Sequence, residues 1–116
     1  MKDFNGILQY KGKDYKLVFN LNVMEKIQEE YGSIEEWGKM TDGKGNQEPN
    51  AKAVIFGFKE MINEGIDIQN EEEGTDIPFV SLKQVGRMIT DFGVKDATDK
   101  LNETVINSTQ SEEKNE

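Results

Sequence analysis

The stretch that decides the fold is YKLVFNLNVMEKIQEEYGSIEEW, residues 15–37. It begins with an alternating run typical of a β-strand and continues with apolar residues at helical spacing. Gly32 favours the left-handed conformation in which helices end, and Ser33 with Glu36 is typical of the cap that begins a new helix. The stretch therefore predicts a strand, a helix, a glycine stop and a second helix.

The residues before this stretch predict the partner strand of a β-hairpin over about residues 5–19. Gly12-Lys13 suits a two-residue turn of type II′. This turn would pair Tyr10 with Tyr15, Leu8 with Leu17 and Gly6 with Phe19. Because strand side chains alternate, one face would be apolar, and the other, with Ile7, Gln9, Lys11, Lys16 and Val18, mostly polar. An isolated hairpin is marginally stable, so we expect a helix to cover the apolar face.

Helical spacing and capping residues predict five helices, over about residues 21–31, 33–40, 51–64, 81–92 and 94–107. Asn20 or Asn22 would cap the first, Asn50 the third and Ser81 the fourth, and Gly65 would end the third. The expected inward stripes of the last three helices are Val54/Ile55/Phe58/Met61/Ile62, Leu82/Val85/Ile89/Phe92 and Val94/Ala97/Leu101/Val105.

The segments between these helices predict loops. Residues 41–50 are rich in turn formers and predict a mobile loop, and residues 66–80 predict an acidic loop. Residues 108–116 contain no apolar side chain and predict a disordered acidic tail. The fold class that follows is α+β: a single domain over residues 1–107, with an N-terminal hairpin packed on a small, mostly helical bundle of four to five helices.

The charge of the chain argues against nucleic acids and membranes as partners. The formal net charge is −9, and residues 41–80 carry three Lys against nine acidic residues, a net charge of −6. No basic stripe is present to neutralise phosphates or anionic lipids. The acidity favours solubility, and a cationic or amphipathic protein partner is the alternative reading. Without a secretory signal or a long apolar run, we expect a cytoplasmic protein.

The residue types argue against an enzyme. The chain contains no His and no Cys, so it lacks the commonest general base, imidazole metal ligands and thiol nucleophiles. Asp42, Lys44 and Asn46 imitate the start of a calcium loop, but the sixth position is Gln47 and the twelfth is Ala53. We therefore expect no catalytic residues, no metal site and no cofactor.

Three apolar features have two readings each. Phe56 lies off the main stripe beside Gly57, which leaves room for close approach: its helix is buried on two sides, or Phe56 docks a partner. Trp37 belongs to the core or is a binding hot spot. The segment DIPFVS, residues 76–81, clamps the core or accepts a peptide.

The order of these elements resembles a known family. The phrase GKDYKLVFNLNVMEKIQEEYG at residues 12–32 resembles the opening of the phage tail assembly chaperones of siphophages and prophages of low-GC Gram-positive bacteria. In that family a strand pair ends in a phrase like Lys-x-Phe-Asn-x-Asn and leads into a Glu-rich helix that closes on Gly. A short helix, an aromatic-rich helix similar to AVIFGFKEMINEG and C-terminal helices follow. The resemblance spans residues 5–107, with loops at 41–50 and 66–80 longer than expected.

The resemblance implies a function without catalysis. Such a chaperone binds the phage tape measure protein, helps recruit tail tube subunits during tail morphogenesis in the cytoplasm of the bacterial host, and is not retained in the virion. A longer frameshifted product with an extra C-terminal domain is common in such families. Taken with their positions off the stripes or beside loops, the side chains expected to face the client are Trp37, Met40, Phe56, Ile77 and Phe79.

Two other classes of function are compatible with the sequence. The first is a structural phage protein, such as a tail completion or head–tail connector subunit, which would persist in purified particles. The second is a small acidic regulator that imitates DNA, which would require carboxylates at phosphate-like spacing.

Overall fold

The computed structural model describes the backbone of residues 5–42 and 48–114, and the side chains of residues 6–42 and 48–108. Two antiparallel strands form the hairpin, β1 (Asn5–Tyr10) and β2 (Lys13–Val18). Five helices follow: α1 (Leu21–Tyr31), α2 (Ile34–Thr41), α3 (Ala51–Glu73), α4 (Leu82–Phe92) and α5 (Val94–Lys114). The predicted α+β class, an N-terminal hairpin with a mostly helical remainder, is confirmed.

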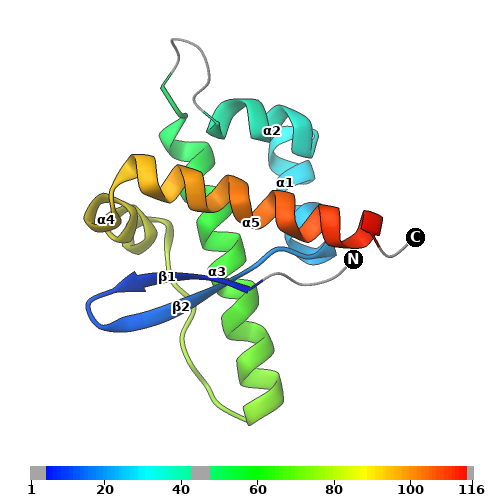
Figure 1. Ribbon diagram of the computed structural model, residues 1–116. Helices are drawn as coiled ribbons and strands as arrows, with labels where there is room; N and C mark the ends of the chain where they lie inside the picture. The colour runs from blue at the N-terminus through cyan, green and yellow to red at the C-terminus, as the bar shows by residue number, and fades with distance from the viewer. Residues whose placement is uncertain (1–4, 43–47, 115–116) are drawn as a thin grey trace.

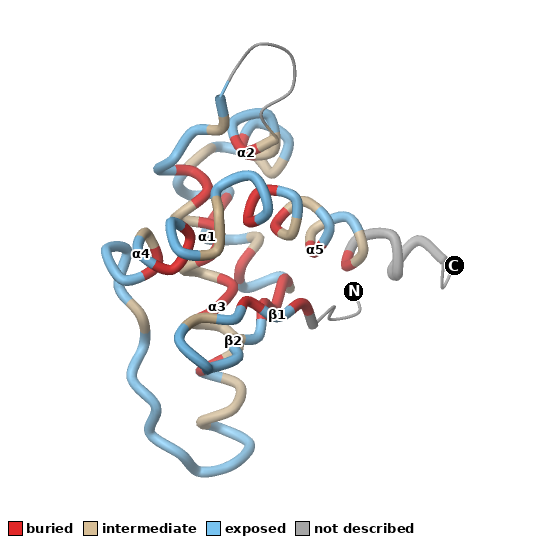
Figure 2. The backbone as a smooth tube through the Cα atoms, turned by 60° about the vertical axis from the view of Figure 1, so that its left-hand side comes forward, coloured by how far each residue is buried: buried red, intermediate tan, exposed pale blue. Residues whose placement is uncertain are grey.

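The long helix α3 is the central element. It contacts β2 and each of the other four helices. Figure 1 shows α3 running through the molecule with the hairpin crossing it, while α5 crosses α3 above the hairpin. The side chains that meet around α3 form one core, and Figure 2 shows the buried residues on the facing sides of these elements. Its largest fully buried members are Trp37, Phe19, Phe58, Leu8, Leu17, Ile27, Met61, Ile62, Met88 and Leu101.

The register of the hairpin differs from the prediction. Tyr10 pairs with Lys13, Leu8 with Tyr15 and Gly6 with Leu17, so the turn is Lys11-Gly12 and not Gly12-Lys13. Both turn residues have positive φ, 49° and 79°, as a type I′ turn requires. The shift is two residues, so each side chain keeps its face, and Leu8, Leu17 and Phe19 are buried as expected. Val18, expected on the polar face, is also buried.

Helix α3 is longer than predicted because Gly65 does not end it. A Cβ built on Gly65 would lie 3.0 Å from the backbone oxygen of Lys16, so the missing side chain lets α3 pass close to β2. The same passage buries Val18, whose Cγ2 would lie 3.5 Å from that Cβ. The helix ends instead at Gly74, which has the left-handed conformation with φ 68° and ψ 24°. Residues 66–73 of the predicted acidic loop are therefore helical, and residues 74–81 have no regular secondary structure.

The remaining boundaries agree closely with the sequence, with one exception. Asn20 caps α1, Ser33 caps α2, and Ser81 with Gln84 forms a complete capping box at α4. The exception is α5, which continues to Lys114, so the segment from residue 108 predicted to be a disordered tail is helical to that point. Its Glu, Gln and Lys residues are good helix formers even without an apolar stripe. Residues 43–47 of the predicted mobile loop lie outside the described residues, and Thr41 belongs to α2.

Candidate partner-binding surface

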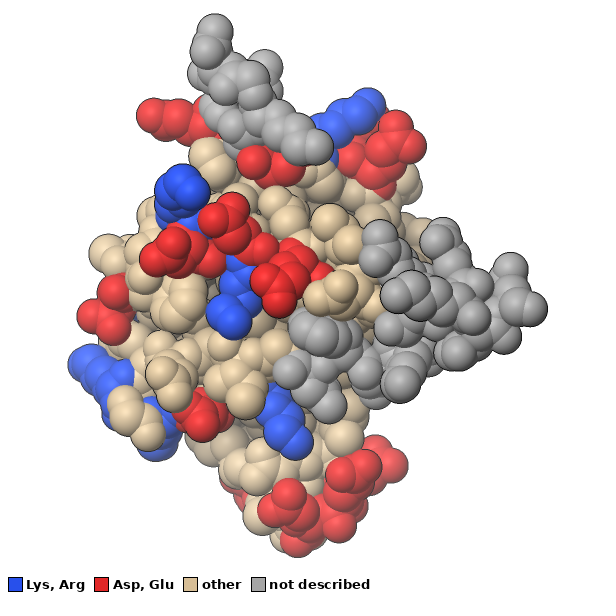
Figure 3. All heavy atoms as spheres, viewed as in Figure 1, with Lys and Arg blue, Asp and Glu red and all other residues tan. Residues whose placement is uncertain are grey.

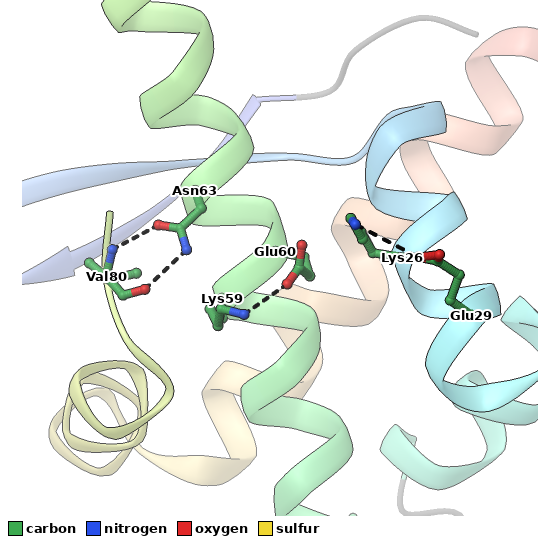
Figure 4. A network of polar contacts seen from close by, with 6 residues as sticks. All are labelled: Lys26, Glu29, Lys59, Glu60, Asn63 and Val80. Carbon is green, nitrogen blue, oxygen red and sulfur yellow. Dashed lines mark hydrogen bonds and ion pairs between the residues drawn. The ribbon is translucent and has the colours of Figure 1, made fainter. Parts of the chain in front are cut away.

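The segment between α3 and α4, residues 74–81, returns along α3 and is called the strap below (Figure 1). Two asparagines of α3 hold its backbone. The side chain of Asn63 accepts a hydrogen bond from the Val80 N–H at 2.8 Å and donates one to the Val80 carbonyl at 3.0 Å (Figure 4). Asn70 does the same for Ile77, at 2.9 and 3.0 Å. Because the asparagines are seven residues apart, they lie on one face of α3.

Fixed in this way, the strap presents apolar side chains to solvent. Val80 is half-buried and packs against the core, whereas Ile77 is 36% and Phe79 57% exposed. A pair of exposed apolar side chains on a backbone that is already ordered is favourable for binding, since less conformational entropy is lost when a partner docks. The strap is therefore a candidate docking element.

One side of the strap borders an acidic groove between α1 and α3. The ring of Phe79 lines it, together with Val23 and Lys26 of α1 and Glu60 and Asp67 of α3, and its volume is about 160 Å³. Figure 4 shows Lys26 and Glu60 on the two helices that form its walls. The start of α1 is tied to the middle of α3, where the Glu64 carboxylate accepts hydrogen bonds from Asn20 at 2.7 Å and Asn22 at 3.1 Å.

A larger groove lies between the hairpin turn and α4. Its volume is about 670 Å³. It is lined by Tyr10, Ile55, Leu82, Lys83, Gly86, Arg87, Thr90 and Asp91. The sequence placed Leu82 in the inward stripe of α4, but this side chain is 50% exposed, and the buried residues of the helix are Val85, Met88 and Ile89. The position of Leu82, directly after the Ser81 cap, was the only sequence signal that it lies at the edge of the core.

Trp37 does not face a partner, which corrects one of the five predicted client-facing residues. Its side chain is only 1% exposed, and the indole N–H donates a hydrogen bond of 3.0 Å to the carbonyl of Ala53. The indole lies against Gly57 of α3. Trp37 therefore joins α2 to α3 as a core residue, the first of the two readings that the sequence left open.

The side chain of Phe56 also packs against other residues of the fold. Its ring is half-buried and packs edge-to-face on Tyr31 with 5.6 Å between centroids, and Lys59 lies 5.8 Å from the ring centre. This arrangement corresponds to a helix buried on two sides. Met40 is 38% exposed at the end of α2. Ile77 and Phe79 lie two positions apart on the strap, and Phe56 is 14 residues, about 21 Å along the axis of α3, from the Asn70 that holds Ile77.

The surroundings of Tyr31 perturb its titration. Burial, with a smaller effect of the neighbouring Glu30 carboxylate, raises the pKa of Tyr31 above its ordinary value. Within residues 5–42 and 48–108, no group of three or more acidic side chains is placed to hold a metal ion. No helix in the described part of the chain has the length and apolar character needed to cross a membrane.

Comparison of the chain with protein-family models, with curated proteins and with solved structures finds no match in any of the three.

Proposed function

We propose that this protein is a phage tail assembly chaperone. It binds the tape measure protein, helps recruit tail tube subunits in the cytoplasm of the bacterial host, and leaves before the virion is complete. The observation that carries the proposal is the strap, on which Ile77 and Phe79 are exposed while Asn63 and Asn70 fix the backbone. The role requires no catalytic group and no cofactor.

The physical requirements of the role fit this surface. A tape measure protein is long and helical, and before the tail closes around it, the apolar faces of its helices need temporary cover. Exposed apolar side chains on a fixed element can provide this cover. The end of α3 and the adjoining strap carry acidic residues, which Figure 3 shows gathered at the lower end of the molecule. They are Glu71, Glu72, Glu73 and Asp76. Their mutual repulsion keeps the exposed strap from associating with other copies.

Co-expression with the tape measure protein of the same phage tests the proposal. We expect the tape measure protein to co-purify with the wild-type chain, and Phe79→Asp or Ile77→Asp to reduce the recovered amount at least tenfold. Val94→Asp is the matched control, because Val94 is similarly exposed at 53% but lies at the start of α5, where a carboxylate is tolerated. Undiminished recovery with a folded Phe79→Asp variant would contradict the assignment of the strap.

Mass spectrometry of purified virions tests the second part of the role. A chaperone is expected in infected cells and absent from particles, whereas a tail completion or connector subunit persists in particles in fixed copy number. Presence of this protein at one or more copies per particle would contradict the chaperone role and favour the structural alternative.

A further inference from the structure

The groove between the hairpin turn and α4 has an apolar floor. It is lined by Tyr10 at the end of β1, Leu82 at the start of α4 and Ile55 of α3. Gly86 leaves the backbone of α4 bare at this point, because a Cβ built there would meet only Ile55, at 3.5 Å. Figure 1 shows the hairpin turn and α4 at the same side of the molecule. The floor can therefore accept several apolar side chains.

The rim of this groove carries two cations, Lys83 and Arg87, and one carboxylate, Asp91, so its net charge is +1. Lys83 and Arg87 lie four residues apart, on the same face of α4, where like charges repel. Within the described part of the chain neither is in an ion pair, as is also true of Lys11, Lys13, Lys16 and Lys100, whereas the other described lysines are paired. Lys11 adds a third positive charge nearby, with its Nζ 5.3 Å from the centre of the Tyr10 ring. Although the net charge of the chain is −9, the rim of this groove is therefore locally positive.

We propose that this groove binds an acidic amphipathic helix of another protein. The apolar face of the helix would cover Tyr10, Ile55 and Leu82, and its flanking carboxylates would pair with Lys83 and Arg87. Arginine suits this role because its guanidinium can hold a carboxylate through two parallel hydrogen bonds. A cationic partner would be attracted to the rest of the acidic surface but repelled at this rim. The inference rests on the groove alone and holds whether or not the client is a tape measure protein.

Two synthetic helical peptides separate this local effect from the overall charge. Both carry the same leucine stripe over about 15 residues or more; glutamates flank it in one peptide and lysines in the other. The net charge of the protein favours the lysine peptide, whereas the groove favours the glutamate peptide. We expect the glutamate peptide to bind at least tenfold more tightly in fluorescence anisotropy, with an affinity that falls as salt is added. Equal or tighter binding of the lysine peptide would overturn the proposal.

Variants locate the binding. Arg87→Gln should weaken binding of the glutamate peptide about tenfold, through loss of a charge-assisted hydrogen bond. Gly86→Leu should abolish it by filling the floor, while Lys95→Gln, whose lysine pairs with Asp99 on α5, should leave it unchanged. Gly86→Leu replaces a poor helix former with a good one, and circular dichroism confirms that each variant is folded. Unchanged affinity for the glutamate peptide in a folded Arg87→Gln variant contradicts the proposal. The proposal is also contradicted if the wild-type protein self-associates and Arg87→Gln abolishes this association, since the groove would then bind a second copy of the chain.

Discussion

The indole of Trp37 packs so closely on Gly57 that a Cβ at position 57 would overlap its Cζ2 and lie 3.2 Å from its Cε2. This contact joins α2 to α3, and the hydrogen bond from the indole to Ala53 fixes the ring in place. A large, rigid ring that is held at both its edge and its face cannot move aside cheaply. Gly57 is thus required by packing and not by backbone conformation.

Gly57→Ala should therefore destabilise the protein. Overpacking of a core typically costs about 1–3 kcal/mol, while replacing glycine in a helix gains about 1 kcal/mol, so we expect a net loss of up to about 2 kcal/mol. Gly38→Ala is the matched control, because nothing lies within 4 Å of its added Cβ and only the helix gain applies. Urea unfolding monitored by circular dichroism measures both. Equal effects of the two substitutions would show that the Trp37 contact is loose.

Sequence patterns predicted the elements of this fold better than their ends. The caps at Asn20, Ser33 and Ser81 were visible because short polar side chains bond to backbone N–H groups only a few residues away. The prediction that Gly65 ends α3 was wrong because glycine has two uses: it adopts the left-handed conformation that ends a helix, and it lets two backbones approach closely. Only the tertiary structure shows that β2 lies against Gly65. Local rules cannot distinguish these uses when the contact partner is 49 positions away, at Lys16.

Asn63 and Asn70 hold the strap, so removing one of these side chains should loosen the strap locally without unfolding the protein. Asn63→Ala removes both side-chain hydrogen bonds to Val80 and should cost about 1–2 kcal/mol of local stability. Hydrogen exchange at the Val80 amide should accelerate about tenfold or more, while amides in the middle of α1 keep their protection. Asn102→Ala on α5 serves as the control. Exchange at Val80 that stays at the wild-type rate would mean that the strap is held by other contacts.

The candidate site was less predictable than the fold. Ile77 and Phe79 could be identified because a proline and turn residues interrupt the helical spacing around them. A tryptophan on a short helix is more often a core residue than a binding hot spot, but the sequence could not decide for Trp37, because its burial depends on the missing side chain at Gly57. The groove at α4 was missed because it combines Tyr10, Ile55 and Leu82 from three separate elements.

The raised pKa of Tyr31 predicts that the folded protein loses stability at alkaline pH. Its pKa is raised in the folded state, so its contribution is fully present below the unfolded pKa of about 10 and is lost as the pH rises through the folded value. Tyr31→Phe should remove this dependence. It should also raise the free energy of unfolding at neutral pH by about 1 kcal/mol, because the buried hydroxyl has no hydrogen-bond partner among the described residues. Parallel slopes for both proteins in urea titrations above pH ~9 would contradict the assignment to Tyr31.

The hairpin turn offers a test in which the predicted and the observed registers give opposite signs. Lys11 adopts φ 49°, which costs a side chain with a Cβ about 1–2 kcal/mol, and asparagine tolerates this conformation better. Lys11→Asn should therefore stabilise the protein by about 0.5–1 kcal/mol, since Asn-Gly is the preferred type I′ pair. Lys13→Asn, in β2, should be neutral or destabilising because asparagine is a poor strand former. With a Gly12-Lys13 turn the order would reverse, because residue 11 would lie in the strand and residue 13 in the turn. Thermal unfolding of the two variants therefore reports the register directly.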